Sequence, residues 1–156
     1  MNFLFNFFLI ASLTLCTPYD NVHKAVLDFL DTVQHQVLVA GYSISDPEIV
    51  EKLVAMHQRG IDVEVITDKT QAAGMYEEES LERLEQFHIP VLRAKSLYNQ
   101  LMHCKFMTAD DTESIDGSYN FTKSANYQDN VLHIDHDPAL AIQLHKFWNQ
   151  IKEDLR

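Results

Sequence analysis

The chain is poor in the residues that cross-link or interrupt a small fold. Its 156 residues include two cysteines, four glycines and four prolines. Two cysteines, Cys16 and Cys104, cannot build a disulfide framework, so a hydrophobic core has to hold the fold. Because 46% of the residues are hydrophobic, the chain is long enough for one compact domain with such a core. A second globular domain is not expected.

Basic residues are also scarce. Twelve Lys and Arg residues stand against 23 Asp and Glu residues, which gives a formal net charge of -11. No whole-molecule basic field can therefore attract a polyanion, and a phosphate-bearing substrate would have to be held by a local cluster. This balance argues mildly against tight binding of nucleic acid.

The first 16 residues, MNFLFNFFLIASLTLC, contain no charged side chain. Their apolar run is short for a membrane span but fits the core of a signal peptide. We therefore expect a signal peptide over 1–16, a domain over 17–156, and export to the periplasm or the medium. Since no Lys or Arg lies near Met1, the alternative is an uncleaved anchor that associates the protein with a membrane.

Hydrophobic periodicity predicts helices that alternate with strands. The predicted helices cover 19–33, 45–60, 77–88, a short stretch after Gly117, and 138–152. The predicted strands cover 36–43, 61–67, 89–94, 130–134 and a hairpin formed by 103–110 and 113–116. This order predicts an α/β fold with a mixed β-sheet that is flanked by helices on both faces. The acidic run EEES at 77–80 is expected to be the solvated start of its helix.

The stretch HCKFMTADDTESIDGSYN, 103–120, carries the candidate chemistry. His103 and Lys105 are two residues apart, so on a strand they point to the same face. Gly117, Ser118 and Asn120 lie at a turn before a predicted helix, where backbone N–H groups and the helix dipole favour an anion. An imidazole, an ammonium, a hydroxyl and an amide that converge on an anion suit a phosphate ester.

The pattern H-x-K-x4-D-x6-G-S-x-N, which includes Asp110, fixes six identities over 18 positions, so an accidental match is not expected. It resembles the signature of the phospholipase D superfamily, and the similarity covers most of the chain. The small single-motif members, which are bacterial endonuclease-like proteins and their mitochondrial relatives, are the most similar. The resemblance implies a phosphodiesterase, with an endonuclease acting on DNA or RNA as the leading function. The alternatives are a phospholipase D acting on phosphatidylcholine-type lipids and a catalytically silent phosphate-binding module.

The resemblance also implies a homodimer, because single-motif relatives bring two motifs together across a symmetry axis. His103 of one protomer would attack phosphorus to give a phosphohistidine, and His103 of the other would protonate the leaving oxygen and then activate water. Lys105 and Asn120 would hold the phosphate oxygens, and Ser118 would donate a further hydrogen bond. The family mechanism needs no metal and no cofactor.

Two further acids enter through the resemblance. Asp110, like Gly117, is expected to shape the strand-turn and not to touch substrate. Asp129, just before Asn130 and Val131, matches a carboxylate that orients the histidine, although a Glu is usual there. Asp116 departs from the family pattern, since a carboxylate facing the phosphate would repel it by ~1 kcal/mol or more. We expect Asp116 to point away along the strand edge.

Other candidate residues have simpler interpretations. The sequence HIDHD, 133–137, follows no strong metal-ligand spacing and is interpreted as a solvated strand end. Cys104 alternates away from His103 and Lys105, which predicts a packing role and not a thiol nucleophile. Phe147 and Trp148 are expected to be core or dimer contacts.

Overall fold

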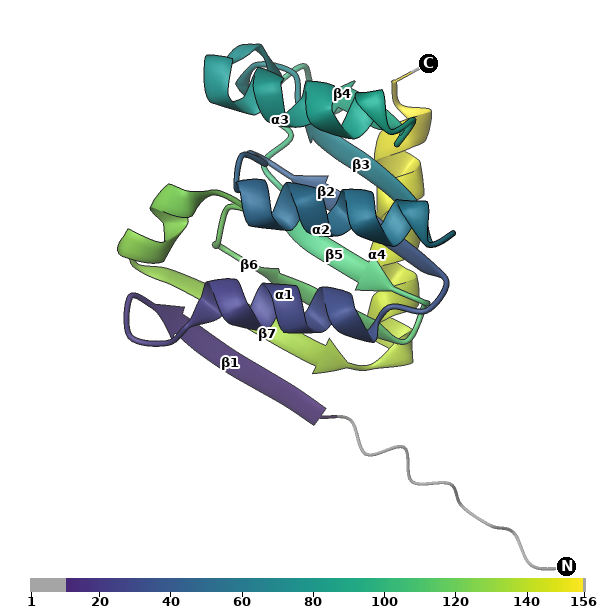
Figure 1. Cartoon of the computed structure of the whole chain (residues 1–156). Helices are drawn as coiled ribbons and strands as arrows, with labels where there is room; N and C mark the ends of the chain where they lie inside the picture. The colour runs from purple at the N-terminus through teal and green to yellow at the C-terminus, as the bar shows by residue number, and fades with distance from the viewer. Residues whose placement is uncertain (1–10, 156) are drawn as a thin grey trace, which may run out of the picture.

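A seven-stranded mixed sheet forms the centre of the molecule (Figure 1). The computed structural model describes residues 11–155. The strands lie in the order β1-β7-β6-β5-β2-β3-β4. Their bounds are β1 Ala11–Thr17, β2 Gln36–Gly41, β3 Asp62–Asp68, β4 Val91–Ala94, β5 Lys105–Ala109, β6 Glu113–Gly117 and β7 Asn130–His136. Strands β2, β3 and β4 are parallel, whereas β5, β6, β7 and β1 pair antiparallel.

Helices cover both faces of this sheet, which confirms the predicted α/β class. Helices α1 (Val22–Thr32), α2 (Pro47–Gln58) and α3 (Met75–Gln86) lie on one face, and α4 (Pro138–Glu153) lies on the other (Figure 1). The larger apolar core lies under the first three helices, and a smaller one that includes Phe106 and Trp148 lies under α4. Two short 3-10 turns, Gln71–Ala73 and Lys123–Tyr127, complete the described elements.

Local sequence signals explain where α2 begins and ends. Asp46 caps the helix, since its carboxylate accepts hydrogen bonds from the backbone N–H groups of Glu48 and Ile49, and Pro47 occupies the first turn. After the helix, Gly60 adopts φ +90°, a conformation that favours glycine. The predicted helix over 45–60 is therefore confirmed with tighter bounds.

Strand β1 was not predicted. It pairs along its whole length with β7, from Ala11 opposite His136 to Thr17 opposite Asn130. Leu15 packs against the larger core, and the Thr17 hydroxyl donates to the carbonyl of Gln128 at 2.6 Å. The expected boundary between 16 and 17 thus falls inside a paired strand, while residues 1–10 lie outside the described range. Cleavage of the segment stays a prediction, and it would remove this edge strand from the sheet.

None of the helices in the described range has the length and apolar character that a bilayer-spanning segment needs.

Candidate active site

His103 and Lys105 lie where β5 enters the sheet, beside the end of β2. Lys105 pairs with Gly41, and the backbone N–H of Tyr42 donates to the carbonyl of Cys104 at 2.7 Å. The parallel strands β2 and β3 end at this same edge of the sheet, because residues 41 and 67 are partners. The ends of several strands therefore bring side chains from distant parts of the sequence to one place.

The His103 imidazole and the Lys105 ammonium are in direct contact. Lys105 Nζ lies 3.4 Å from both ring nitrogens of His103 and donates to the His103 carbonyl at 2.9 Å. The Tyr42 ring packs on both residues, with its centroid 4.5 Å from that of His103 and 4.8 Å from Lys105 Nζ. His103 is exposed, whereas Lys105 is only 8% exposed. A reachable imidazole thus lies against a buried cation.

The Lys105 ammonium has an unusual electrostatic setting. Burial lowers its pKa below the ordinary lysine value, and the neighbouring Cys104 thiol offsets part of that shift. Among residues 11–155 no carboxylate forms an ion pair with Lys105. The charge of this group is therefore not neutralised by the fold and is suited to an anionic ligand.

Asn120 joins the site through the loop after β2. Ile44 and Phe121 form a parallel bridge, and the N–H of Phe121 donates to the carbonyl of Ser43 at 3.2 Å. The Asn120 side chain makes no hydrogen bond within the described part of the chain, and its Oδ1 atom is buried. Its amide is therefore not used by the fold, and its contact with a phosphate stays a prediction.

Gly117 and Ser118 contribute to the fold at this edge. Gly117 has φ +153°, and a Cβ there would lie 2.1 Å from the carbonyl oxygen of Val131, so only glycine fits. The Ser118 hydroxyl accepts from the N–H of Val131 at 3.0 Å and donates to Asn130 Oδ1 at 3.3 Å. A hydrogen bond from Ser118 to a phosphate stays a prediction, and it would require this hydroxyl to leave Asn130.

The predicted short helix after Gly117 is present as a 3-10 turn at Lys123–Tyr127, which begins later than expected. The residues from Ser118 to Thr122 are irregular. The N–H groups of Ser118 and Phe121 are already bonded to Val131 and Ser43, because this segment is held between β7 and the loop after β2. A helix dipole therefore does not contribute to anion binding here.

Asp110, the third motif residue, lies at the other end of β5. Its carboxylate accepts from the backbone N–H groups of Gln34, His35 and Gln36, each at 2.8 Å. Partial burial acts to raise its pKa, but these three bonds outweigh it and hold the pKa below the ordinary value. These contacts give Asp110 a place in the fold, and its lack of contact with substrate stays a prediction.

The other two acids, Asp129 and Asp116, have different surroundings. Asp129 is exposed, and no hydrogen bond or ion pair joins it to His103 in the range that the structure covers, so its orienting role stays a prediction. Asp116 pairs across the sheet with Phe106 and His133, and Phe106 belongs to the core under α4. Partial burial raises the pKa of Asp116. Its side chain therefore faces the opposite side of the sheet from Lys105.

Cys104 and the C-terminal aromatic residues behave as packing residues. Cys104 packs against the core under α4, and burial raises the pKa of its thiol, which disfavours the thiolate. Trp148 is fully buried and donates to the carbonyl of Val39 at 3.0 Å. Phe147 stacks on Phe106, with 6.1 Å between ring centroids, and remains 46% exposed.

The HIDHD residues have separate partners. His133 Nδ1 contacts the Thr14 hydroxyl at 3.0 Å, and His136 contacts Glu113 at 2.9 Å. Asp137 caps α4 by accepting from the N–H of Ala139 at 2.9 Å. Within residues 11–155 there is no group of three or more potential metal-ligating side chains.

Three residues near the site were missed from the sequence. Tyr42 follows a buried strand and packs on His103, as described above. Asp68, at the end of β3, is fully buried. Its carboxylate accepts at 2.9 Å from the N–H of Met102, the residue before His103. Glu77 was expected to be solvated but is only 4% exposed, which corrects the interpretation of the EEES run. Its spacing from Leu81 and Leu84, which are also buried, placed it on the apolar stripe of α3.

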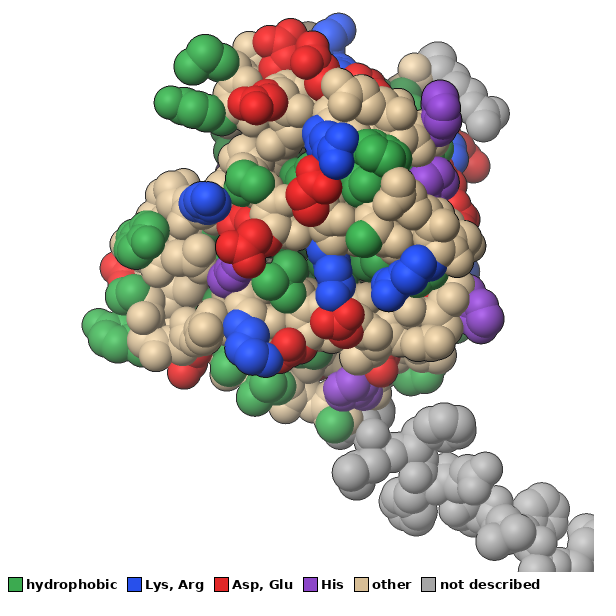
Figure 2. All heavy atoms as spheres, in the orientation of Figure 1, with side chains coloured by type: hydrophobic (Ala, Val, Ile, Leu, Met, Phe, Trp, Pro, Cys, Tyr) green, Lys and Arg blue, Asp and Glu red, His purple; other side chains and the backbone are tan. Residues whose placement is uncertain are grey.

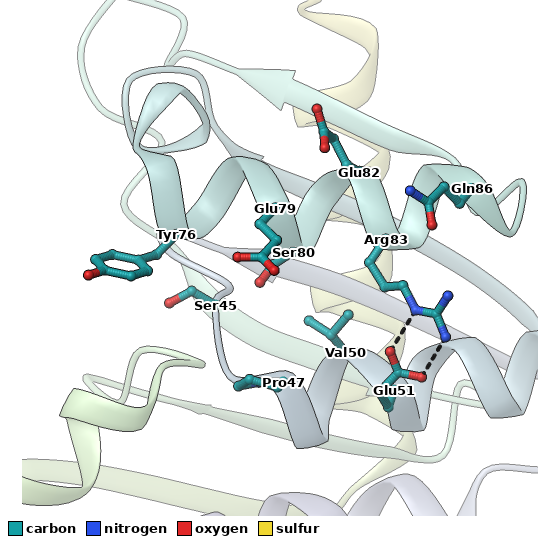
Figure 3. Close-up of a pocket in the computed structure, with 10 residues that line it drawn as sticks. All are labelled: Ser45, Pro47, Val50, Glu51, Tyr76, Glu79, Ser80, Glu82, Arg83 and Gln86. Carbon is teal, nitrogen blue, oxygen red and sulfur yellow. Dashed lines mark hydrogen bonds and ion pairs between the residues drawn. The ribbon is translucent and has the colours of Figure 1, made fainter.

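Two hollows near this edge differ in character. One of about 300 Å³ has His103 in its wall together with apolar side chains that include Leu97, Leu101 and Phe147. The other, of about 380 Å³, lies between α2 and α3 (Figure 3). Glu51, Glu79 and Glu82 line it, and its one arginine, Arg83, is paired with Glu51 at 2.6 Å. The second hollow is therefore unsuited to a phosphate.

The charges on the face that carries α1, α2 and α3 are mixed. Figure 2 shows acidic and basic side chains interspersed over this face, without one dominant sign. Five cations are paired with carboxylates: Lys24, Lys52, Arg83, Arg93 and Lys152. This distribution agrees with the expectation that an anion would be held by a local cluster.

The sequence matches a family model and several curated proteins. A model described as "Cardiolipin synthase, PLD-like domain" matches residues 26–152, which include the whole stretch from His103 to Asn120. "Phospholipase D" of Rickettsia bellii is 28% identical over 137 residues, which are 86% of this chain and 66% of that protein. "Mitochondrial cardiolipin hydrolase" of Chlamydomonas reinhardtii is 26% identical over 131 residues, which are 81% of this chain and 57% of that protein. The chain thus spans less than two thirds of the length of these relatives.

Solved structures share the whole fold. Nuc from Salmonella typhimurium, a phospholipase D family member, superposes with a TM-score of 0.85 at 24% identity, over 93% of this chain and 95% of that one. NucT from Helicobacter pylori gives a TM-score of 0.86 at 19% identity, over 93% and 97% of the two chains. At these identities the likeness establishes the architecture and leaves the chemistry to be argued from the site.

Proposed function

We propose that this chain, which belongs to the phospholipase D superfamily, is a phosphodiesterase that acts through a phosphohistidine formed on His103. The observation that carries the proposal is the contact between an exposed imidazole and a buried lysine without a carboxylate partner. A neutral imidazole nitrogen of His103 attacks phosphorus, and the bond from phosphorus to the leaving oxygen breaks. Lys105 stabilises the charge on the non-bridging oxygens, and the free amide of Asn120 donates to them.

The reaction needs a second acid–base group. A proton has to reach the leaving oxygen, and a water molecule then has to lose a proton as it attacks phosphorus and the P–N bond breaks. Since the described residues hold one such histidine–lysine pair, we propose a homodimer in which His103 of the second protomer performs both proton transfers. A protein that is strictly monomeric and fully active at assay concentration would contradict this arrangement.

Nucleic acid is the leading substrate class. Lys69 follows β3 and Lys95 follows β4, at the edge where these strands end, and Lys123 lies three residues after Asn120. None of the three forms an ion pair with a carboxylate in the range covered, unlike the five cations paired elsewhere. A nucleic-acid strand carries many phosphates and would contact several of these cations at once, whereas a substrate with one phosphate would not. We therefore propose an endonuclease acting on DNA or RNA.

A specific observation favours a second candidate, a phospholipase D acting on phosphatidylcholine-type lipids. The hollow beside His103 is lined by Leu97, Leu101 and Phe147, of which Leu97 is 72% exposed. Apolar walls next to the nucleophile suit the apolar part of a lipid. The names of the Rickettsia and Chlamydomonas relatives, phospholipase D and cardiolipin hydrolase, also point to lipid substrates.

One assay tests the reaction and the substrate together. The purified full chain is offered DNA, RNA and phosphatidylcholine vesicles in excess chelator, with bis(p-nitrophenyl) phosphate as a substrate that favours neither class. We expect hydrolysis to persist in chelator, because histidine and lysine take the place of a divalent ion, and DNA or RNA to be cleaved faster than lipid. Loss of all activity in chelator, with recovery on adding zinc or magnesium, would contradict the phosphohistidine mechanism.

A further inference from the structure

We propose that Glu77 is a positioning residue of the active site. It holds loop 42–46. Tyr42 lies at one end of this loop, and the other end is hydrogen-bonded to Phe121, the residue after Asn120. The geometric part of this proposal stands on the structure alone, whereas its effect on rate rests on the proposed function.

Glu77 is a buried acid with three hydrogen-bond donors and no cation. Its two oxygens accept from the Ser43 hydroxyl at 2.5 Å, the Ile44 backbone N–H at 2.7 and 2.8 Å, and the Thr67 hydroxyl at 2.9 Å. It occupies the buried face of α3 together with Leu81 and Leu84, while Tyr76 and Glu79 of the same helix are among the residues that line the hollow in Figure 3. A carboxylate in an apolar stripe is unfavourable unless its oxygens are hydrogen-bonded, and here they are.

The loop that Glu77 holds reaches both halves of the motif. On one side, Tyr42 directly precedes Ser43 and packs its ring on His103 and Lys105. On the other side, the N–H groups of Ser45 and Asp46 both donate to the carbonyl of Phe121 at 3.0 Å, one residue after Asn120. A displacement of this loop would therefore move the contacts of the imidazole, the ammonium and the amide together.

Packing leaves the loop little room to move by itself. A Cβ at Gly41 would lie 2.5 Å from Ile44 Cγ1 and 3.1 Å from Phe121 Cδ2, so Ile44 and Phe121 fill the space over this glycine. Ile44 is also the residue whose N–H is bonded to both Glu77 oxygens. Loss of the carboxylate would leave a buried N–H group without a partner, and the loop would have to shift to reach water.

The test compares Glu77→Leu, which removes every acceptor, with Glu77→Gln. The glutamine can keep the same network if the Ser43 hydroxyl turns from donor to acceptor. Asp110→Ala is the matched control, because it removes a carboxylate that also has three donors, but at the far end of β5. Circular dichroism and thermal melts establish that each variant is folded.

Two readouts are needed. The first is kcat and KM for bis(p-nitrophenyl) phosphate. The second is the NMR signals of the His103 ring in histidine-labelled protein, assigned with His103→Asn and calibrated with Tyr42→Leu, because the Tyr42 ring current shifts these signals. We expect Glu77→Leu to lower kcat by about 10- to 100-fold with little change in KM, and to move the His103 signals toward their Tyr42→Leu positions. Glu77→Gln and Asp110→Ala should keep both near wild type.

The outcomes separate positioning from general structural support. An unchanged His103 signal in folded Glu77→Leu, or an equal fall in kcat in Asp110→Ala, overturns the proposal. If Glu77→Leu does not fold, Ser43→Ala removes one donor instead, and a smaller shift of the His103 signals in the same direction is expected. An unchanged signal in Ser43→Ala then overturns the proposal. If wild type hydrolyses no phosphodiester, the proposed function fails, while the NMR comparison still decides whether Glu77 positions His103.

Discussion

Strand β5 places residues of one sequence motif at two opposite edges of the sheet. The polar side chains at these two edges differ in whether the fold uses their hydrogen-bonding groups. At the Lys105 end, the ammonium has no carboxylate partner and the Asn120 amide has no hydrogen bond in the described range. At the Asp110 end, the carboxylate accepts three backbone N–H groups. Motif residues whose hydrogen-bonding capacity is used by the fold therefore serve the fold. Those whose capacity is left open are available to a ligand.

The largest effect is expected for His103→Ala, at the Lys105 end of β5. It should remove the nucleophile of one protomer and the acid of the other, so phosphodiester hydrolysis should fall by well over about 100-fold. The fold should remain, because His103 is exposed. The measurement is the rate of bis(p-nitrophenyl) phosphate hydrolysis by folded protein, with Cys104→Ser as a control that should keep most activity. A loss within about tenfold would be too small for a nucleophile.

Lys105→Met sharpens the comparison, since it removes the charge and keeps the apolar stem. We expect a loss of about 100-fold in kcat/KM, as for the removal of one electrostatic contact to the reacting group. In wild type, the lowered Lys105 pKa predicts that activity falls on the alkaline side at a pH below the ordinary lysine value of about 10.4.

The sign for stability follows from the same shift. Between the lowered folded pKa and the ordinary value, the unfolded chain binds more protons, so Lys105 makes stability rise with pH in that window. Urea unfolding at several alkaline pH values should show this slope in wild type and a smaller one in Lys105→Met. Equal slopes, together with an alkaline limb at the ordinary lysine pKa, would contradict the described setting of Lys105.

Asp110→Ala should have the smallest effect on activity. It should leave kcat/KM within about threefold and lower the free energy of unfolding by about 1–3 kcal/mol, because three N–H groups lose their acceptor. The lowered pKa of Asp110 means that its contribution is present above the unfolded carboxyl pKa and is lost as pH falls through the folded pKa. The difference in urea midpoint between wild type and variant should therefore shrink in acid. A large loss of kcat in folded Asp110→Ala would mean that Asp110 also acts in the reaction.

Sequence periodicity predicted the elements whose pattern is local. The buried run at 36–43, the capped helix at 45–60 and the hairpin at 103–116 all appear, and the two-residue spacing brought His103 and Lys105 into contact. Strand β1 was missed because its alternation, with Leu15 inward, continues an apolar run that also fits a signal peptide. Its partner β7 lies more than a hundred residues away, and local patterns carry no information about such pairing.

The site was predictable only in part. Candidate catalytic residues stand out by type and spacing, as His103 and Lys105 did. Tyr42 and Glu77 act through the three-dimensional arrangement of loop 42–46, and each resembles an ordinary residue in its own segment. Glu77 did carry a signal. It lies four residues before Leu81 and seven before Leu84, so it shares their face of the helix.

The register of β1 against β7 sets how far the start of β1 lies from the candidate active site. Thr17 lies opposite Asn130, near Ser118, whereas Ala11 lies opposite His136 at the edge that carries Asp110. Seven residues of strand therefore separate the entry of the chain at Ala11 from the active-site edge, about 20 Å. Helix α4 runs the same way, from Pro138 just after β7 to the active-site edge, where Gln150 and Asp154 line the hollow beside His103. A tether attached before Ala11 would therefore lie at the edge away from the site, whereas a tether attached after Asp154 would lie beside the hollow that His103 lines.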